Sequence, residues 1–169
     1  AGRTASVPCA GDSGRNTLNK VKLDLNQMVS EVWEESQMID EKHRYLFRGT
    51  DPAYMTGDIA MIKQSIRIFV QNAAKYSSDG ADITLGVMLE SGYVSYMIQD
   101  EGIGMESSDV VHIFERFYRS DEARNSETGG SGLGLSIAKW IVDAHSGTIQ
   151  VVSRPEIGTR FIVRFPMCE

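Results

Sequence analysis

The chain has 169 residues, of which 41% are hydrophobic and 24% are charged. This length and composition are typical of one soluble globular domain that buries a sizeable core. The net charge of −6 argues against a surface built for nucleic acid or an anionic membrane, and no apolar run is long enough to span a bilayer.

The chain divides into a short polar start and one long folded region. Residues 1–19 are rich in Gly, Ser, Thr, Arg and Asn and lack hydrophobic periodicity, so we expect a linker or a disordered arm there. Residues 20–169 carry the helical and strand patterns described next, and we expect them to form the domain.

The first elements of the domain alternate between strand and helix. Residues 21–25 alternate apolar and polar side chains and predict a short strand. Asn26 is the expected N-cap of an amphipathic helix that reaches about Ile39. A second strand is predicted over residues 44–48, and a loop over residues 49–57.

A long helix and a hairpin follow. Asp58 is the expected N-cap of a helix that ends near Tyr76 and carries apolar side chains at helical spacing. Residues 82–89 and 93–99 have strand-like patterns, and residues 90–92 between them predict a short hairpin loop.

The last part of the chain places a polar segment between a short amphipathic piece and a final helix. Residues 109–117 are amphipathic, and the polar run after them is long enough to predict either a functional lid or a disordered segment. A helix is predicted over residues 133–144, followed by two closing strands over residues 148–152 and 159–165. Strands joined mostly as hairpins, with helices grouped elsewhere, predict an α+β two-layer sandwich.

A glycine-rich stretch, residues 129–134, comes immediately before the last predicted helix. Glycines let a ligand approach the backbone closely, and a helix start offers free N–H groups and the positive end of its dipole. Together these features indicate a seat for phosphate groups. A flexible loop before an ordinary helix fits the same residues, and the chain has no Walker A sequence.

Two polar residues lie where they could contact such a ligand. Asp100 ends a predicted strand directly before Gly102 and Gly104, and a carboxylate suits an exocyclic amine such as that of adenine. Asn72 lies on the long helix, where its side-chain oxygen suits Mg²⁺, and Lys75 follows one turn later. Taken singly, Asp100 also fits a turn, and the other two also fit a solvated helix face.

Five segments of the chain form a joint pattern. They are residues 72–76, 100–105, 113–119, 130–135 and 158–159. In this order they resemble the N, G1, F, G2 and final Gly-Thr boxes of the ATP-binding catalytic domain of bacterial sensor histidine kinases. The superfamily also holds gyrase-type and chaperone ATPases. The resemblance covers about residues 23–167 and implies a Bergerat-type fold, in which helices back a mixed, mostly antiparallel sheet beside a mobile ATP lid.

The resemblance implies ATP and Mg²⁺ as ligands and gives roles to individual residues. Asp100 would accept a hydrogen bond from the adenine amino group, and Thr159 would line the same end of the site. Asn72 would hold Mg²⁺ on the phosphates, with Lys75 and Tyr76 near them. The implied catalytic residues are Asn72, Lys75 and Arg119.

The same resemblance assigns the glycines and aromatic residues around the lid. Gly102 and Gly104 would let the lid begin against the nucleotide, and Phe114 and Phe117 would anchor it. Arg119 would meet the γ-phosphate. Backbone N–H groups of Gly132 and Gly134 at the helix start would bind the phosphates. The nucleotide-binding set implied by these boxes also includes Ile103, Phe117, Gly130, Leu133 and Leu135.

One position departs from the family pattern. Four residues before Asn72, on the same helix face, the superfamily usually has Asn or Glu, and this chain has Ile68. Gln71 is polar, but it points elsewhere on a helix. A water-activating base is therefore missing at that place, which argues against a self-sufficient ATPase and leaves open a weakened kinase.

The resemblance implies a histidine protein kinase domain of a two-component system, which transfers the γ-phosphoryl of ATP to a histidine on a separate dimerisation domain. His43, His112 and His145 do not lie in the sequence context of such an acceptor. We therefore expect the acceptor domain to precede residue 1, and this fragment to be inactive without it.

The implied partners are that acceptor domain, a response regulator and a second copy in a homodimer, without nucleic acid. The implied location is cytoplasmic, with membrane attachment only through parts outside this chain. Two alternatives stay open: a non-catalytic nucleotide-binding module, or pseudokinase, which Ile68 supports, and a gyrase- or chaperone-type ATPase. The aromatic residues of segment 113–119 and the absence of Glu at position 68 argue against the second alternative.

Overall fold

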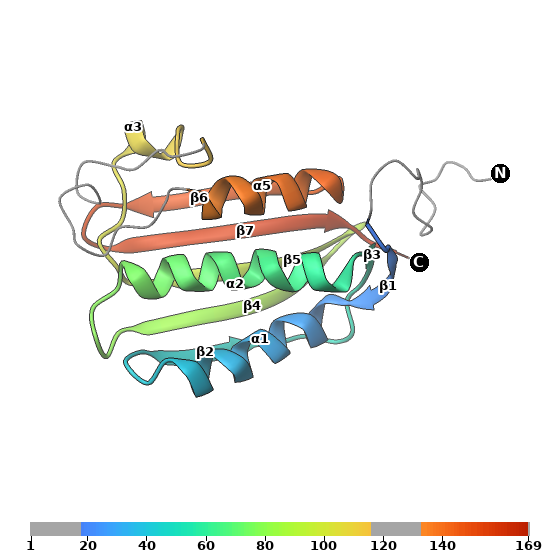
Figure 1. Ribbon diagram of the computed structural model, residues 1–169, viewed down its shortest axis with the longest axis horizontal. Helices are drawn as coiled ribbons and strands as arrows, with labels where there is room; N and C mark the ends of the chain where they lie inside the picture. The colour runs from blue at the N-terminus through green and yellow to red at the C-terminus, as the bar shows by residue number, and fades with distance from the viewer. Residues whose placement is uncertain (1–17, 116–132, 169) are drawn as a thin grey trace.

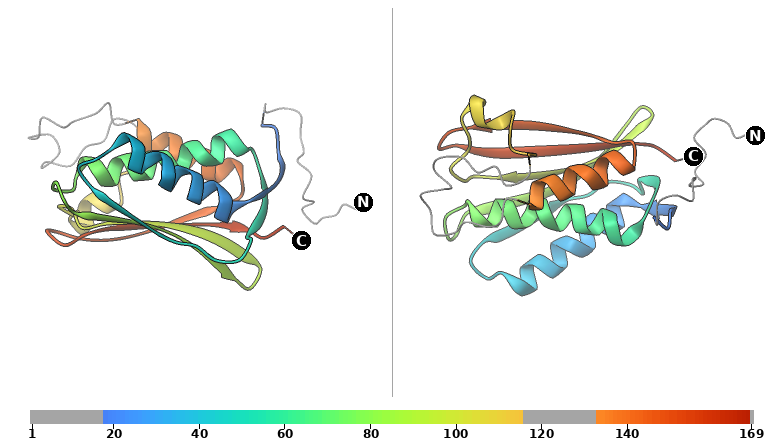
Figure 2. Two further views of the ribbon diagram at one scale, coloured as in Figure 1. Left: turned by 90° about the horizontal axis from the view of Figure 1, so that it is seen from below. Right: turned by 45° about the horizontal axis from the view of Figure 1, so that its top comes forward.

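The domain is a sandwich of one β-sheet and one layer of helices (Figures 1 and 2). A computed structural model describes residues 18–115 and 133–168. The main sheet has five strands in the order β2-β4-β5-β7-β6. These strands are β2 (Arg44–Arg48), β4 (Asp82–Glu90), β5 (Tyr93–Asp100), β7 (Gly158–Pro166) and β6 (Thr148–Arg154). Only the β2–β4 pair among these neighbours is parallel, which confirms the predicted mixed and mostly antiparallel sheet.

Three long helices cover one face of this sheet (Figure 2). They are α1 (Leu25–Ile39), α2 (Ile59–Lys75) and α5 (Gly134–Ala144). Each turns an apolar face toward the sheet, as a helix of this kind must if it is to be held by packing. A one-turn helix, α3 (Ser107–Val110), lies beside β6. Among residues 18–115 and 133–168, no helix is long and apolar enough to cross a membrane.

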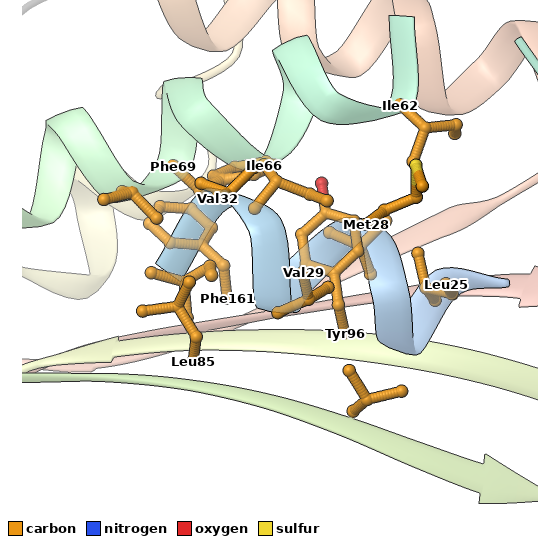
Figure 3. Packing of buried hydrophobic residues seen from close by; sticks show 14 of the residues in the cluster. Leu25, Met28, Val29, Val32, Ile62, Ile66, Phe69, Leu85, Tyr96 and Phe161 are labelled. Carbon is orange, nitrogen blue, oxygen red and sulfur yellow. The ribbon is translucent and has the colours of Figure 1, made fainter. Parts of the chain in front are cut away.

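The core lies between the two layers. Figure 3 shows Met28 and Val32 of α1 and Ile66 of α2 reaching toward Leu85 and Tyr96 of the sheet. All of these side chains are buried. Burying one large apolar side chain stabilises a fold by about 1.5–3 kcal/mol relative to leaving it exposed to water.

One polar contact and one aromatic contact fix the position of α2 on the sheet. The Ser65 hydroxyl lies 2.8 Å from the Tyr96 hydroxyl, so neither buried group is left without a partner. The rings of Phe69 and Phe161 lie 4.6 Å apart between centroids, on α2 and β7. The register of α2 over the central strands is thereby set.

The cap of α1 is Asp24, and the prediction of Asn26 for this role was wrong. Oδ1 of Asp24 accepts hydrogen bonds from the backbone N–H of Asn26, at 3.0 Å, and from that of Ala53, at 2.9 Å. The side chain of Asn26 instead accepts from the N–H of Thr50. Both residue types suit a cap, and the long-range contact with Ala53 decides between them.

The predicted loop over residues 49–57 contains a strand, so this prediction was wrong at its end. β3 (Tyr54–Gly57) pairs antiparallel with β1 (Val21–Asp24) in a separate two-stranded sheet. β3 has four residues and follows Pro52, so its own sequence carries little strand signal. It forms a strand because it pairs with β1, whose residues are thirty or more positions earlier in the chain.

The other long helices and the other strands agree with their predictions to within a few residues, whereas α3 covers only the first part of the amphipathic piece predicted over residues 109–117. Asp58 caps α2 by accepting a hydrogen bond from the N–H of Met61, and α2 ends before Tyr76. The hairpin between β4 and β5 turns over two residues, Ser91 and Gly92. The predicted arm is described only at Leu18 and Asn19, and residues 116–132, which include most of the lid predicted over about residues 106–131, lie outside the described residues.

Candidate functional site

Asp100 lies at the end of β5, where three segments of the chain meet. Its side chain is buried, and Oδ1 accepts a hydrogen bond from the N–H of Gly102 at 2.8 Å. The same oxygen accepts from the N–H of Thr159 on β7 at 3.3 Å. Among the described residues, Oδ2 accepts no hydrogen bond. One carboxylate oxygen is thus fixed by the backbone, and the other is left to accept a bond from a ligand.

Burial raises the pKa of the Asp100 carboxyl to about 6, chiefly because the charged form loses its hydration. The two backbone N–H donors favour the carboxylate and partly oppose this effect, and the neighbouring charge of Glu101 raises the pKa further. A buried carboxyl with a raised pKa at the end of a central strand is a candidate functional position.

The segment from Gly102 to Gly104 fits closely against the end of α2 and the turn between β6 and β7. A Cβ at Gly102 would overlap the carbonyl oxygen of Tyr76, and a Cβ at Gly104 would overlap that of Arg154. Gly104 also has φ of +69°, which favours glycine. The N–H of Ile103 donates to the carbonyl of Tyr76 at 3.1 Å. This close fit requires glycine for steric reasons, whatever ligand the site takes.

Thr159 reaches the site through its backbone. It is paired with Asp100 in the β5–β7 register and donates its N–H to that side chain. Its hydroxyl lies 2.7 Å from the hydroxyl of Ser153 on β6, whose Oγ also donates to the carbonyl of Gly158. Ser153 had no motif to mark it, and sequence reasoning missed it as the partner that orients Thr159.

The last turn of α2 brings three more of the predicted residues to this end of the domain. Asn72 is half-buried, and among the described residues its side chain makes no hydrogen bond. The Nζ of Lys75 lies 5.5 Å from the centroid of the Tyr76 ring, within the range of a cation–π contact. The carbonyl of Tyr76 holds Ile103, so α2 and the Gly102–Gly104 segment form one continuous structure.

The start of α5 lies against α2 one turn before Asn72. α5 runs beside α2 in both views of Figure 2. A Cβ at Gly134 would lie 3.6 Å from Cγ2 of Ile68, which is an ordinary contact. The cap residue Leu133 provides no side-chain hydrogen bond to the first turn of α5. Such a helix start offers backbone N–H groups to an anion.

Ile68 therefore has a packing role at this place. It is partly buried against the core, and its methyl group faces the backbone of Gly134. Leu135 also packs against the core from the first turn of α5. The apolar residue at position 68 thus fills the space between α2 and the start of α5.

The predicted lid residues divide into two groups. Phe114 is described, and its ring meets that of Phe161 edge-on with centroids 6.4 Å apart. Ile113 beside it is buried. The four predicted residues Phe117, Arg119, Gly130 and Gly132 lie outside the described residues. The structure thus brings together Asp100, Gly102, Ile103, Gly104 and Thr159 at one place, and it places Asn72, Lys75, Tyr76, Leu133 and Gly134 along α2 and the start of α5.

Comparison with known sequences gives one matching family and many related sensors. Residues 57–169 match the family described as histidine kinase-, DNA gyrase B-, and HSP90-like ATPase. The sensor histidine kinase YkoH of Bacillus subtilis is 38% identical over 143 residues, which are 85% of this chain and 31% of YkoH. The sensor-like histidine kinase SenX3 of Mycolicibacterium smegmatis is 32% identical over 85% of this chain and 38% of its own length. The chain thus spans about a third of the length of these relatives.

Solved structures share the fold. The mycobacterial sensor histidine kinase MprB is similar with a TM-score of 0.77 and 24% identity, over 89% of this chain and 99% of that one. Full-length ShkA, in complex with AMPPNP, gives a TM-score of 0.78 at 22% identity, over 92% of this chain and 33% of that one. At these identities the likeness shows the fold alone. The match over residues 57–169 shows the family: the chain belongs to the histidine kinase-, DNA gyrase B-, and HSP90-like ATPases.

Proposed function

We propose that this chain binds Mg-ATP and transfers its γ-phosphoryl group to a histidine on a dimerisation domain that lies in another part of the parent protein. The observation that carries the proposal is the Asp100 carboxylate, with Oδ1 fixed by two backbone N–H groups and Oδ2 accepting no hydrogen bond among the described residues. The adenine amino group is a donor that suits Oδ2.

The residues around Asp100 would hold the two ends of the nucleotide. Thr159 and the Gly102–Gly104 segment would form the adenine end. The phosphates would lie toward the start of α5, where backbone N–H groups favour anions, with Lys75 supplying positive charge on a chain of net charge −6. Phe117, Arg119, Gly130 and Gly132 keep the roles that the sequence resemblance gave them.

Asn72 fits a magnesium ligand. Its side chain is half-buried and makes no hydrogen bond among the described residues, and Mg²⁺ takes few protein oxygens besides phosphates and water. When bound, the ion would neutralise charge on the phosphates. Asn72 would contribute one neutral oxygen, which leaves the total charge of the site unchanged.

The reaction needs little covalent chemistry from the protein. The acceptor imidazole nitrogen attacks the γ-phosphorus, the bond to the β–γ bridging oxygen breaks, ADP leaves, and the imidazole loses its proton. Positioning and electrostatic stabilisation supply most of the catalysis in such transfers. Position 68 has no carboxylate that could activate water for attack on the γ-phosphorus, because the residue there is Ile68, whose methyl group lies against α5.

In the parent protein, the partners would be the acceptor domain, a second copy in a homodimer, and a response regulator that receives the phosphoryl group. The site would face the cytoplasm, and any membrane anchor would lie outside this chain. Nucleic acid is not among the proposed partners, because the chain is acidic overall.

The test supplies this chain with γ-labelled ATP, Mg²⁺ and the acceptor domain of its parent protein. Acid-labile, base-stable label on that domain is expected, and none should form with an acceptor whose histidine is replaced by Gln. ATP binding without any transfer would favour a pseudokinase instead, a candidate that the apolar Ile68 supports. Steady phosphate release without the acceptor would favour an ATPase.

A further inference from the structure

His43 lies in a cluster that links α1 to the end of α2. Nδ1 of the ring lies 2.7 Å from Oδ2 of Asp40, which directly follows α1. Nε2 lies 3.1 Å from the backbone carbonyl oxygen of Ser77, which follows the cap of α2. The hydroxyl of Tyr45 donates to the same Asp40 oxygen at 2.6 Å. The side chain of His43 is only 5% exposed.

Both partners of the ring are acceptors, and this fixes its charge state. A neutral imidazole has one N–H donor, whereas the imidazolium has two. A carboxylate and a carbonyl oxygen both need a donor, so the two contacts of His43 are satisfied together only when the ring is protonated. A neutral ring would direct one nitrogen lone pair at an oxygen, which is unfavourable.

The electrostatic surroundings agree with this geometry. Burial is the largest single effect and disfavours the imidazolium, whereas the hydrogen bonds to Asp40 and Ser77 and the negative charges of Asp40 and Asp79 together favour it. The balance raises the pKa of His43 above its ordinary value of 6.5. Asp40 faces the ring from the end of α1, Tyr45 from β2, and Asp79 from the turn between α2 and β4.

The held carbonyl is one residue from the nucleotide site. Tyr76 precedes Ser77, and its carbonyl accepts the N–H of Ile103 and lies where a side chain on Gly102 would collide with it. Gly102 in turn donates to Asp100. Among the described residues, the buried hydroxyl of Ser77 has no hydrogen-bond partner. His43 therefore contacts Ser77 through its backbone carbonyl and not through its side chain. A chain of direct contacts therefore runs from His43 to Asp100.

We propose that the protonated imidazole of His43 is a positioning group, which holds the Tyr76–Ser77 backbone in the geometry that the adenine end of the site needs. Loss of the proton releases the carbonyl of Ser77 and weakens nucleotide binding. The domain thereby couples its affinity for nucleotide to pH on the alkaline side of 6.5. This inference rests on the proposed binding of ATP at Asp100.

The first test measures the affinity for ADP with Mg²⁺ by calorimetry between pH 6.5 and 8.5. The wild-type affinity should fall about fivefold over this range, at the low end of couplings between sites. His43→Gln should bind weakly at pH 6.5 and show no such fall. Tyr45→Phe removes the hydroxyl that donates to the same Asp40 oxygen but keeps the titrating ring, so it should keep the fall. Equal pH dependence in wild type and His43→Gln would overturn the inference, whereas no ADP binding at any pH would overturn the proposed function itself.

The second test does not depend on any variant folding. An NMR titration of the wild-type histidine rings should show that His43 loses its second ring proton above the ordinary pKa of 6.5. Linkage requires ADP binding to lower the acid dissociation constant of His43 by the same factor by which protonation strengthens ADP binding. A fivefold coupling therefore corresponds to a rise of about 0.7 in the pKa of His43. A His43 ring whose pKa lies at or below 6.5, or whose pKa does not respond to ADP, would contradict the proposed role.

Discussion

Thr159 donates its backbone N–H to Oδ1 of Asp100 across the β5–β7 pair. The two residues are 59 positions apart, yet they are direct partners in the sheet register. Because Gly102 donates to the same oxygen, the carboxylate cannot rotate without breaking both bonds. The sheet therefore presents Oδ2 in one direction, which is what recognition of a single amino group requires.

We expect Asp100→Asn to weaken nucleotide binding without harming the fold. The Asn oxygen can still accept from Gly102 and Thr159, which leaves its NH₂ group facing the amino group of adenine. Loss of one hydrogen bond to a charged acceptor should lower the affinity about 10- to 100-fold. Calorimetry with ATP measures this change.

The control for this substitution is Asp143→Asn. Asp143 is an exposed residue of α5 that pairs with Lys139, so its loss should leave the affinity unchanged. Thermal unfolding should show Asp100→Asn at least as stable as wild type at pH 7, because burial disfavours the carboxylate. An affinity equal to that of wild type would remove Asp100 from the site.

Nucleotide affinity should also fall in acid. The pKa of Asp100 is about 6, and only its carboxylate form suits the adenine amino group. Below pH 6 the affinity should therefore drop by up to about tenfold for each pH unit, as binding competes with one proton. Titrations of ATP binding at pH 5.0, 5.5, 6.0 and 7.0 measure this slope, and Asp100→Asn should show a flatter profile. A wild-type affinity that is constant over this range would contradict the role of the carboxylate.

The raised pKa of Asp100 also has a consequence for stability. The folded state binds this proton more tightly than the unfolded state, whose Asp has an ordinary value of 3.8. Lowering the pH from about 6 toward 4 therefore stabilises the fold through this group while weakening the site. As the pH falls from about 6 toward 4, the contribution of Asp100 to the free energy of unfolding should rise while the affinity for nucleotide falls.

Two glycines near the site should respond differently to alanine. Gly102→Ala brings a methyl group onto the carbonyl of Tyr76, so we expect a loss of stability of about 1–3 kcal/mol from overpacking, with loss of binding. Gly134→Ala meets only Ile68 at an ordinary distance, and Ala favours a helix by up to about 1 kcal/mol over Gly. Urea unfolding and ATP calorimetry on both variants separate the two roles.

The outcome for Gly134→Ala is informative in its own right. If the start of α5 binds phosphate, this variant should be at least as stable as wild type and should bind ATP more weakly. A stable variant with unchanged affinity would assign the position to the fold alone. A Gly102→Ala variant as stable as wild type would contradict the tight fit against Tyr76.

The sequence predicted the main helices and strands because each has its own periodicity. α2 carries its apolar residues at helical spacing after an Asp that caps it, and the structure agrees. β3 and the cap at Asp24 were missed for a common reason. Both depend on a contact between residues 21–24 and residues 53–57, and no local pattern in either segment specifies the other.

The site shows the same division. Asp100, Asn72 and the glycines are marked by the motifs that carry them, so the sequence could name them. The hydroxyl pair of Ser153 and Thr159 and the link from His43 to Ser77 join residues from different elements. Ser153, His43 and Ser77 lie outside the five motif segments. Their partners become visible only after the strands are in register and the end of α2 is placed against the α1–β2 loop.

His145 should make the fold sensitive to acid. It is buried at the end of α5, where Nδ1 donates to the carbonyl of Ile141 at 2.7 Å and Nε2 accepts from the N–H of Asp58 at 3.1 Å. This arrangement needs the neutral ring. Burial, with a smaller effect of the Lys20 charge, lowers the pKa of His145, although the Ile141 carbonyl and the Asp58 charge oppose the shift. A protonated Nε2 would face the N–H of Asp58 and lose the bond that ties α5 to the start of α2.

Because the pKa of His145 is lower in the folded state, the unfolded chain takes up its proton first as the pH falls below the ordinary value of 6.5. The free energy of unfolding should then decrease through this group by at most about 1.4 kcal/mol for each pH unit. The pKa of His43 is raised in the folded state, so its effect on the free energy of unfolding has the opposite sign: it stabilises the fold fully below pH 6.5, and this stabilisation is lost as the pH rises. Urea unfolding of wild type and His145→Gln at pH 7.5 and 5.5 isolates the first effect, because only the difference between the two proteins counts. The acid-induced loss should be smaller in His145→Gln, and an equal loss in both would show that the His145–Asp58 contact does not depend on the charge of the ring.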